Sequence, residues 1–411
     1  MRDTNTLFII LILMSAFNGC HKDDLSSRSL GKITSVASPA GEGSGEANLF
    51  ATDDGRVLLS WIEPGIKKQH SLRFSVWETE GWSQSQIIAE GDHWFVNWAD
   101  FPSLISMSGD WLAAHWLAKS GEGTYAYDVN IVQSSNAGKS WHQPIVPHDD
   151  GTPTEHGFVS LLPWNDTKFL AVWLDGRNFS KHAGHSSAAA EMSLRAAFID
   201  QKGTLTGETV LDSRVCDCCQ TSAVRTANGA IVSYRDRSEN EIRDISAVRF
   251  EKGQWSSPYP VYEDGWEING CPVNGPSLAA AEKRVAVAWF TEANQTPRVK
   301  VGFSNDEGQT FGEPVIVDDG HPIGRVDAVM LPDGGALVSW VEKIETAAEI
   351  RIRYVQQNGT TSPSRTVAKT SLSRASGFPQ MAYSNGQIYI AWTVPGQPSF
   401  IRTAVSKLIA K

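Results

Sequence analysis

The stretch Val285-Ala-Val-Ala-Trp289 is one of seven short apolar segments in this chain, and each segment ends at a tryptophan or tyrosine. A polar loop follows every segment. The aromatic markers are Trp61, Trp116, Trp173, Tyr234, Trp289, Trp340 and Trp392. By subtraction, successive markers stand 55, 57, 61, 55, 51 and 52 residues apart. This period, with alternating strand patterns and Gly, Asp and Asn turns, is typical of a β-propeller with four strands per blade.

The repeat around this segment divides into four expected strands, at residues 276–281, 285–290, 298–304 and 311–317. The last repeat, residues 378–406, supplies three strands. We expect residues 32–38 to add its fourth strand and close the ring, which removes exposed strand edges. Alternatively, carboxyl-terminal residues supply that strand. The predicted fold is therefore an all-β, seven-bladed propeller, with six blades as the alternative.

The amino terminus has the pattern of an export signal. Arg2 precedes an apolar run at residues 7–14, and small or neutral residues then lead to Cys20. We interpret residues 1–19 as a signal peptide, Cys20 as a lipidated cysteine at the start of a tether ending at residue 31, and residues 32–411 as one propeller domain. An ordinary signal peptide with a chance cysteine is the alternative. The expected location is the bacterial cell envelope, with a lipid anchor in the membrane and the domain facing the periplasm or the cell surface.

Composition narrows the class of partner. The formal net charge is −10 and the chain has no cluster of Lys and Arg, which argues against a nucleic-acid partner because phosphate binding needs a basic face. Among fifteen tryptophans, Trp94, Trp98 and Trp266 fall in expected loops. A flat apolar surface in a loop suits a sugar ring, so a glycan or a small anionic ligand is the expected partner.

Two of the expected turns carry a further pattern. Residues 304–311 read SNDEGQTF, and residues 134–141 read SSNAGKSW. Both resemble the Asp box of the sialidase superfamily, in which an Asp or Asn side chain satisfies backbone N–H groups and Gly takes a conformation that other residues resist. The resemblance implies a sialidase-like propeller and a structural role for Asp306 and Asn136. The superfamily has six blades, whereas this chain has seven repeats.

The loops before each first strand and between the second and third strands are expected to open on one face of the ring. These loops are rich in charged, histidine and aromatic residues, which predicts a central pocket. The candidate ligand-binding residues are Arg237, Arg235, Asp236, Arg177, Asp175, Arg325, Asp327, His156, Trp98 and Trp266. A salt-bridge network that braces a long hairpin is the alternative for the alternating charges at residues 235–244.

The closest local resemblance to sialidases runs over residues 218–238. Arg237 matches an arginine that, in the family, belongs to a triad clamping the sugar carboxylate. Cys218 stands where the family has the glutamate that activates a tyrosine nucleophile. Residues 45–49 offer no arginine in place of the family's Arg-Ile-Pro motif, and residues 324–328 offer no tyrosine. The resemblance thus implies ligand binding without ordinary sialidase chemistry.

Four cysteines follow Cys20. Three are packed as Cys216-Asp-Cys218-Cys219, and Cys271 follows about one repeat later, so the two loops should be neighbours around the ring. An even count in an oxidising compartment suggests two disulfides. The other interpretations are a thiolate site for copper or zinc, helped by His156 or His321, and a redox-active pair.

Three functional hypotheses follow. The first is an exported, lipid-anchored propeller that binds a glycan or anionic ligand without ordinary sialidase activity. The second is an active exo-α-sialidase of the glycoside hydrolase class, although no catalytic residue can be assigned. The third is a metal-binding or redox protein that uses the loops with Cys216, Cys218, Cys219 and Cys271.

Overall fold

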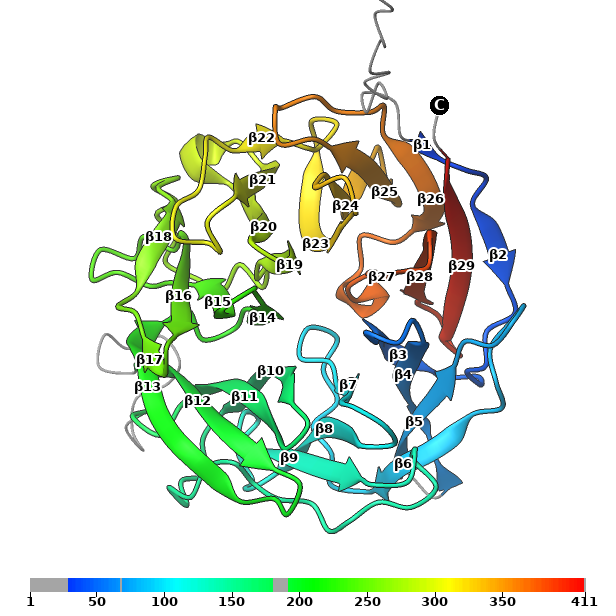
Figure 1. The fold of residues 1–411 in the computed structure, drawn as a ribbon, viewed down its shortest axis with the longest axis vertical. Coiled ribbons are helices and arrows are strands. Elements are labelled where there is room, and N and C mark those ends of the chain that lie inside the picture. The colour runs from blue at the N-terminus through cyan, green and yellow to red at the C-terminus, as the bar shows by residue number, and fades with distance from the viewer. Residues whose placement is uncertain (1–28, 67–68, 180–190, 410–411) are drawn as a thin grey trace, which may run out of the picture.

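The computed structural model describes residues 29–66, 69–179 and 191–409 of the chain. Cys20 and the predicted leader lie outside the described residues. Seven antiparallel sheets stand around a central axis, which confirms the prediction of a seven-bladed propeller over the six-bladed alternative (Figure 1). Among the described residues no helix is long and apolar enough to cross a membrane. The helices η3 (Ala293–Gln295) and η4 (Arg374–Ser376) are single 3-10 turns.

The first four blades follow the order of the chain. Blade 1 contains β3 (Gly45–Ala51), β4 (Val57–Pro64), β5 (His70–Val76) and β6 (Gln86–Gly91). Blade 2 contains β7 (Ser103–Ser106), β8 (Leu112–Lys119) and β9 (Tyr127–Ser134). Blade 3 contains β10 (His156–Asn165), β11 (Lys168–Asp175), β12 (Met192–Asp200) and β13 (Leu205–Val215). Blade 4 contains β14 (Ser222–Arg225), β15 (Gly229–Arg235), β16 (Ile245–Glu251), β17 (Gln254–Trp255) and β18 (Tyr259–Tyr262).

The last three blades complete the ring. Blade 5 contains β19 (Ser277–Ala281), β20 (Arg284–Thr291), β21 (Arg298–Ser304) and β22 (Val315–Ile316), in agreement with the four strands expected for this repeat. Blade 6 contains β23 (Pro322–Met330), β24 (Ala336–Ile344), β25 (Ala347–Val355) and β26 (Arg365–Thr370). Blade 7 contains β27 (Gln380–Ser384), β28 (Gln387–Val394) and β29 (Phe400–Ile409).

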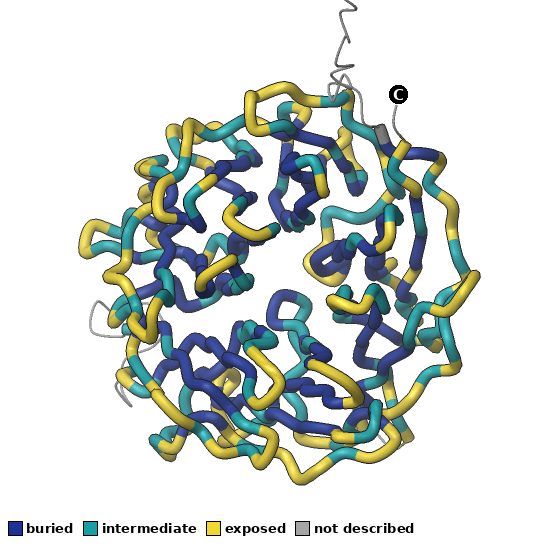
Figure 2. The backbone as a smooth tube through the Cα atoms, in the orientation of Figure 1, coloured by how far each residue is buried: buried dark blue, intermediate teal, exposed yellow. Residues whose placement is uncertain are grey.

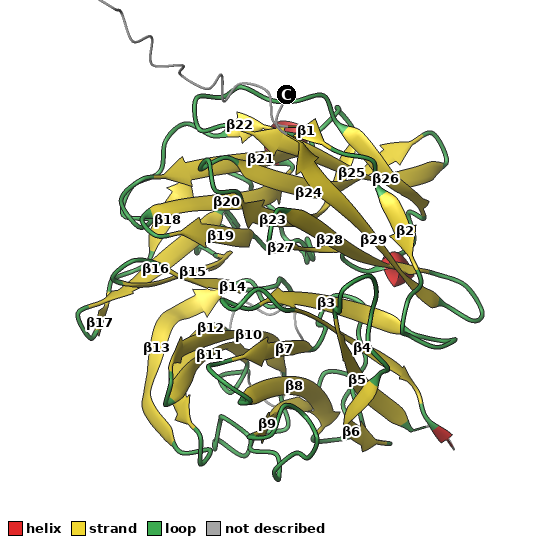
Figure 3. Cartoon of the chain, turned by 45° about the vertical axis from the view of Figure 1, so that its right-hand side comes forward, coloured by secondary structure: helices red, strands yellow, loops and turns green. Residues whose placement is uncertain are grey.

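The amino-terminal strands close the ring at blade 7 (Figure 3). The strand β2 (Thr34–Val36) pairs with β29 through Thr34 and Val405, as expected for residues 32–38. The shorter β1 (Ser29–Leu30) pairs further along the same strand, and its residues fall within the segment predicted as a tether. The outer edge of β29 is therefore covered by backbone hydrogen bonds, which protects it from pairing with another chain.

The seven aromatic markers all lie on the second strand of a blade, in the buried layer where neighbouring sheets pack face to face (Figure 2). In three blades the indole N–H of the marker donates to a carboxylate two residues further on, as Trp61 does to Glu63 at 2.8 Å and Trp173 to Asp175 at 2.9 Å. On the adjacent third strand a cation stands opposite the marker in five blades. These cations are Arg73, Arg195, Lys300, Arg351 and Arg402. In four of these five blades the buried marker keeps its indole N–H bonded, because Trp289 also donates, to Asp264 at 2.7 Å.

The two turns that resemble Asp boxes have the same hydrogen bonds. Asp306 Oδ1 accepts from the backbone N–H of Thr310 at 2.9 Å, and Asn136 Oδ1 accepts from Ser140 N at 2.9 Å. The glycine of each turn has a φ near +80°, a region that residues with a Cβ avoid. Asp306 and Asn136 therefore hold backbone turns, in line with the structural role expected for them.

Candidate functional site

The antiparallel order of the strands gathers the sequence-predicted residues on one face of the ring, which we call the loop face. The first and third strands of each blade begin there, and the second strand ends there. His156 is the first residue of β10, Asp175 is the last of β11, and Arg235 is the last of β15. The cysteine loops connect blade 3 to blade 4 and blade 4 to blade 5, so they open on the same face.

Arg235 is enclosed by the protein. Its side chain is 1% exposed and donates to the carbonyl oxygens of Asn274 at 2.9 Å, Arg243 at 2.6 Å and Phe290 at 2.7 Å. Its guanidinium carbon also lies 4.9 Å from the centre of the Trp266 ring. Arg235 therefore joins blades 4 and 5. Protein carbonyl oxygens, and not a ligand, take up the N–H groups in these three bonds.

The other candidate arginines are also bound internally. Arg237 forms an ion pair with Glu241 at 2.7 Å, and Arg177 pairs with both oxygens of Asp175 at 2.7 Å. Arg325 donates to Ser376 Oγ and to the Ser373 carbonyl oxygen. A sialidase-type clamp needs guanidinium groups that converge on open space, and these groups converge on protein acceptors instead.

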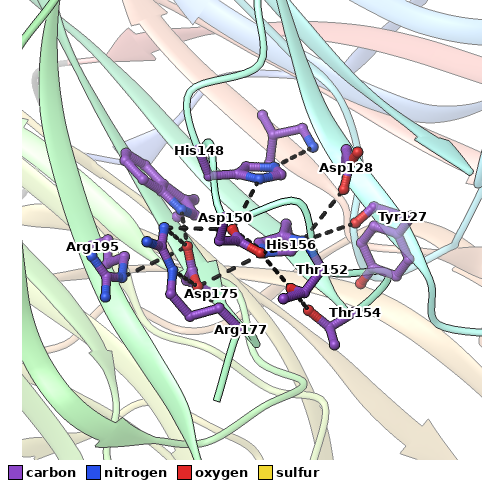
Figure 4. A network of polar contacts seen from close by, with 12 residues as sticks. Tyr127, Asp128, His148, Asp150, Thr152, Thr154, His156, Asp175, Arg177 and Arg195 are labelled. Carbon is purple, nitrogen blue, oxygen red and sulfur yellow. Dashed lines mark hydrogen bonds and ion pairs between the residues drawn. The ribbon is translucent and has the colours of Figure 1, made fainter. Parts of the chain in front are cut away.

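A buried network of histidines and carboxylates lies on blade 3 (Figure 4). The rings of His148 and His156 stack with centroids 3.8 Å apart. His156 Nε2 lies 3.1 Å from Asp150 Oδ2, and its Nδ1 lies 3.5 Å from Asp128 Oδ1. Asp175, which is fully buried, lies 3.8 Å from the same His156 ring. The network ties the loop before β10 to the ends of β9 and β11.

The two stacked imidazole rings differ in their affinity for a proton. Burial opposes protonation of His156, but the carboxylates of Asp128, Asp175 and Asp150 outweigh burial and raise its pKa. Burial and the charge on His156 lower the pKa of His148 to about 4. A proton on this pair of rings is therefore favoured on His156, where three carboxylates surround it, and the network acts as a buried brace.

A buried tyrosine and two acids form a second network that the sequence analysis missed. Tyr127 Oη donates to Glu155 Oε1 at 2.7 Å and lies 3.3 Å from Asp100 Oδ2. Burial raises the pKa of Asp100 to about 7. It also raises the pKa of Glu155 well above its usual range. Tyr127 is 1% exposed and its ring stacks on Phe95 at 4.0 Å, so a sugar cannot reach the phenolic oxygen in this conformation.

The four cysteines in the described part of the chain meet on the loop face as free thiols. Cys216 Sγ lies 3.7 Å from Cys218 Sγ and 3.5 Å from Cys219 Sγ. Cys271 Sγ lies 3.7 Å from Asp217 Oδ1, in one group with Cys218. The two disulfides suggested by the even count are not present among these residues. The prediction that the two loops are neighbours is confirmed.

Arginines surround this thiol cluster. Arg243 Nη1 lies 3.3 Å from Cys216 Sγ, and its Nη2 donates to Glu241 at 2.8 Å. Arg237 binds the same Glu241 carboxylate. Neither His156 nor His321 belongs to the groups of converging donor atoms around the described cysteines. Asp236 pairs its backbone with Val215, and burial raises its pKa to about 6.

A pocket of about 610 Å³ opens on the loop face between blades 1 and 7. Its wall includes the partly exposed Trp98, the carboxyl groups of Glu46 and Glu63, the His70 imidazole and the exposed Arg374. Burial raises the pKa of Glu46 to about 7. Among the described residues no hydrogen bond or ion pair holds the side chains of Glu46 and Arg374.

The partly exposed Trp98 ring has two contacts within the protein. It stacks on Phe378 with centroids 5.7 Å apart, and the Arg325 guanidinium carbon lies 5.0 Å from its centre. Trp266, by contrast, is 5% exposed and packs edge-on against Phe290, so it is a core residue and not the exposed platform that its loop position suggested.

A larger cavity of about 900 Å³ follows the central axis and is lined by the innermost strand of every blade. Asp327 lines it and accepts from Ser277 Oγ at 2.9 Å and from the Met381 N–H, which joins blades 5, 6 and 7. Gln220, just before β14, links the segments before β7 and β19, because its amide N–H donates to Ala99 O and its amide oxygen accepts from Gly275 N–H. The candidate residues therefore surround the axis without sharing one central pocket.

Comparisons with known proteins bear on the fold. No protein-family model matches the sequence, and no curated protein matches it significantly. Among solved structures, a protein of unknown function from Dyadobacter fermentans DSM 18053 matches with a TM-score of 0.53 and 14% identity, over 93% of this chain and 99% of that one. The Hadza microbial sialidase Hz136 matches with a TM-score of 0.51 and 14% identity, over 82% and 73%.

The chain has a sialidase-like β-propeller fold. A glycoside hydrolase family 93 α-L-arabinofuranosidase of Fusarium graminearum is also similar, with a TM-score of 0.48 and 11% identity over 92% of this chain and 98% of that one. At sequence identities this low, the structural similarity shows a shared backbone fold and nothing about side-chain chemistry. The chemistry of this sialidase-like propeller has to be argued from its own side chains.

Proposed function

We propose that this sialidase-like propeller binds an acidic glycan in the pocket between blades 1 and 7, without ordinary sialidase chemistry. The observation that carries the proposal is the pocket's combination of a partly exposed tryptophan with an unpaired arginine and an unpaired carboxyl group. Trp98, Arg374 and Glu46 provide these groups.

Each group suits a different part of a sugar acid. The Trp98 ring offers a flat apolar face for the C–H groups of a pyranose ring. The Arg374 guanidinium can bind a carboxylate with two parallel N–H bonds. Glu46, which holds its proton near neutral pH because it is buried, can donate to a hydroxyl or carboxylate oxygen and does not repel an anion.

The arrangement of the remaining groups supports binding over sialidase catalysis. The candidate arginines Arg177, Arg237 and Arg325 bind protein acceptors, and the Tyr127–Glu155 pair is buried. A covalent sialidase mechanism needs an accessible nucleophile and an acid that flank the same bond. The fold similarity to a structure named as a microbial sialidase supports a carbohydrate ligand in general terms and adds no catalytic group to this chain.

The test combines hydrolysis and binding. A panel of fluorogenic sialosides should stay uncleaved, while calorimetry with carboxylated glycans should detect binding to the wild-type protein. Trp98→Ala and Arg374→Ala should each weaken binding at least tenfold, which is the usual effect of removing a central contact of about 2 kcal/mol. Trp98→Phe should restore part of the affinity, and Arg402→Ala, which removes an exposed arginine on β29, should have no effect.

Two results would contradict the proposal. The first is that Trp98→Ala and Arg374→Ala both bind the glycan as tightly as the wild-type protein does, which would place the ligand elsewhere. The second is hydrolysis of a sialoside by the wild-type protein, which would favour an active exo-sialidase, and its survival in Trp98→Ala would place the active site away from this pocket.

We also propose that the protein is lipid-anchored through Cys20 in a bacterial cell envelope. The basis is the sequence of residues 1–20, where Gly19 and Cys20 follow an apolar run. Cells fed labelled palmitate should label the wild-type protein, and Cys20→Ala should abolish the label and move the protein from the membrane fraction to the soluble envelope fraction. A labelled Cys20→Ala protein would refute the anchor.

A further inference from the structure

The thiol cluster between blades 3, 4 and 5 is separate from the glycan pocket and has no part in the function proposed above. We infer that it is a binding site for one copper(I) ion, held by the sulfurs of Cys216, Cys218 and Cys219. The argument depends on how these sulfurs are spaced, how they are enclosed and what lies next to them.

The spacing of the sulfurs matches a shared metal ion. Thiolates that each lie about 2.3 Å from one ion are about 3.8–4.0 Å from one another. Cys216 Sγ lies 3.7 Å from Cys218 Sγ and 3.5 Å from Cys219 Sγ, and the three sulfurs form one group of mutually close donors. A disulfide needs about 2.05 Å between two sulfurs, so this turn is not arranged around one bonded pair.

The turn after β13 produces this convergence. The loop at residues 216–219 reverses the chain immediately after β13, so three cysteine side chains from four residues point to one side. The Cys216 N–H donates to Arg235 O at 3.0 Å, which fixes the start of the turn against β15. A preformed set of donors of this kind lowers the cost of ordering the chain around an ion.

Three sulfurs, without a fourth donor in the same group, favour copper(I) over zinc. Soft thiolates bind both ions, but zinc sites are usually tetrahedral with four ligands. Cys271 belongs to a different group, with Asp217 and Cys218, and does not join Cys216 and Cys219 among the described residues. Copper(I) is the soft ion that a three-sulfur set suits best.

A cation next to the sulfurs offsets their charge. Three thiolates and one copper(I) ion carry two net negative charges. The Arg243 guanidinium is 3% exposed and lies 3.3 Å from Cys216 Sγ and 3.6 Å from Asp217 Oδ1. Hydrogen bonds to the sulfur and a nearby positive charge are the usual support around thiolate sites.

The ion has a route to the site. Cys216 and Cys219 are 1% and 2% exposed, whereas Cys218 is partly exposed and Cys271 is exposed. An ion can therefore meet Cys271 and Cys218 first and pass to the buried sulfurs. On binding, the three thiols lose their protons to water and the copper stays in the +1 state, so the step needs no oxidant or reductant.

The experiment uses the mature chain, reduced and kept free of oxygen. Copper(I) is titrated against a coloured copper(I) chelator, zinc(II) is titrated separately against a zinc indicator, and free thiols are counted with and without the ion. We expect one copper(I) per chain, weaker binding of zinc, and three thiols that are protected by copper and become reactive again once the chelator removes it.

Matched variants locate the ion. Cys219→Ser should lower copper(I) affinity at least a hundredfold, whereas Cys271→Ser should change it less than tenfold. Arg243→Lys, which keeps the charge but changes the geometry of the donors, should lower it roughly tenfold. Circular dichroism and glycan binding of each variant show whether the fold survives, and unchanged glycan affinity would separate this site from the pocket of blades 1 and 7.

Three outcomes would overturn the proposal. One is a folded, reduced wild-type protein that takes up no copper(I) or holds zinc(II) more tightly. Another is Cys219→Ser binding copper(I) as the wild type does. The third is protein from the cell envelope in which mass spectrometry finds all four thiols paired as disulfides and no thiol titrates after chelation.

Discussion

The histidine–carboxylate network around His156 and Asp175, which we call the brace, and the pocket between blades 1 and 7 lie on the same face of the ring. They differ in whether their charged side chains are paired within the protein. In the brace, Asp175 meets Arg177, His156 and the Trp173 indole, and all of these partners belong to the protein. In the pocket, Glu46 and Arg374 face a cavity without bonds to other described residues. A dense set of polar residues in a loop can therefore mark a structural element, while a sparse set with unpaired groups marks the binding site.

The largest effect is expected in the brace. Asp175→Ala would remove the most deeply buried carboxylate beside Arg177 and His156, which should lower the free energy of unfolding by about 3–5 kcal/mol. Glu208→Ala is the matched control, because Glu208 also pairs with Arg177 and Arg195 but is partly exposed, and it should cost less than about 1 kcal/mol. Urea unfolding measures both. Equal losses would show that burial does not distinguish the two acids.

Arg325 connects the two regions and should have an intermediate effect. Arg325→Met keeps the stem that lies near Trp98 but removes the guanidinium hydrogen bonds to Ser376 Oγ and the Ser373 carbonyl, so we expect a loss of about 2 kcal/mol in the free energy of unfolding. Because these acceptors support η4 and Arg374, glycan affinity should fall as well. Thermal unfolding measures the stability of the variant, and calorimetry on the same samples measures its glycan affinity. A stable variant with normal affinity would contradict the role of Arg325 in connecting the two regions.

The pH dependence of glycan binding should depend on Glu46. Its pKa of about 7 means that it is mostly neutral at pH 6 and mostly ionised at pH 8, so affinity for a carboxylated glycan should fall by close to tenfold between these values. Burial lowers the pKa of His70, which disfavours a positive charge on this imidazole. Glu46→Gln should bind equally at both pH values.

The same group affects stability with a definite sign. The pKa of Glu46 is higher in the folded protein than its usual 4.5, so the folded state holds the proton more tightly. Its contribution to stability is complete below pH 4.5 and is lost as the pH rises to about 7. Glu46→Gln should flatten that part of the pH profile of unfolding, and an unchanged slope would assign it to Asp100 instead.

The smallest effect on stability is expected at the pocket rim. Arg374→Ala removes an exposed side chain without a described partner, so the free energy of unfolding should change by less than about 0.5 kcal/mol. Arg402→Ala should do the same. A loss above 1 kcal/mol for Arg374→Ala alone would show that this arginine belongs to the scaffold, as its counterparts in the brace do.

The fold could be predicted because its signals are local and repeated. The aromatic markers stand on second strands, where packing between sheets requires a large buried ring, and Asp306 and Asn136 stand in turns that only a few residue types can form. Ring closure by residues 32–38 followed from the missing strand in the last repeat. The adjacency of the Cys218 and Cys271 loops followed from the repeat length.

The site was harder to predict because it depends on which partners each side chain meets. Trp98 and Trp266 both stand in loops, and only packing shows that one is partly exposed and the other is buried. In the same way, packing shows that Arg235 is buried and Arg374 is exposed. Glu63 carried a signal that could have been used, since an acid two residues after the marker recurs in blades 1, 3, 4 and 6, and in three of these it accepts from the marker's indole N–H.

The pairing of β1 and β2 with β29 joins the first described residues of the chain to the last. A ribosome makes the two halves of this seam hundreds of residues apart, so the propeller stays open until nearly all of the chain has been synthesised. Any tether attached before Ser29 would pull directly on that seam. Mechanical load on such a tether would thus peel the seventh blade first, and it would reach the pocket between blades 1 and 7 before the cysteine loops of blades 3 to 5.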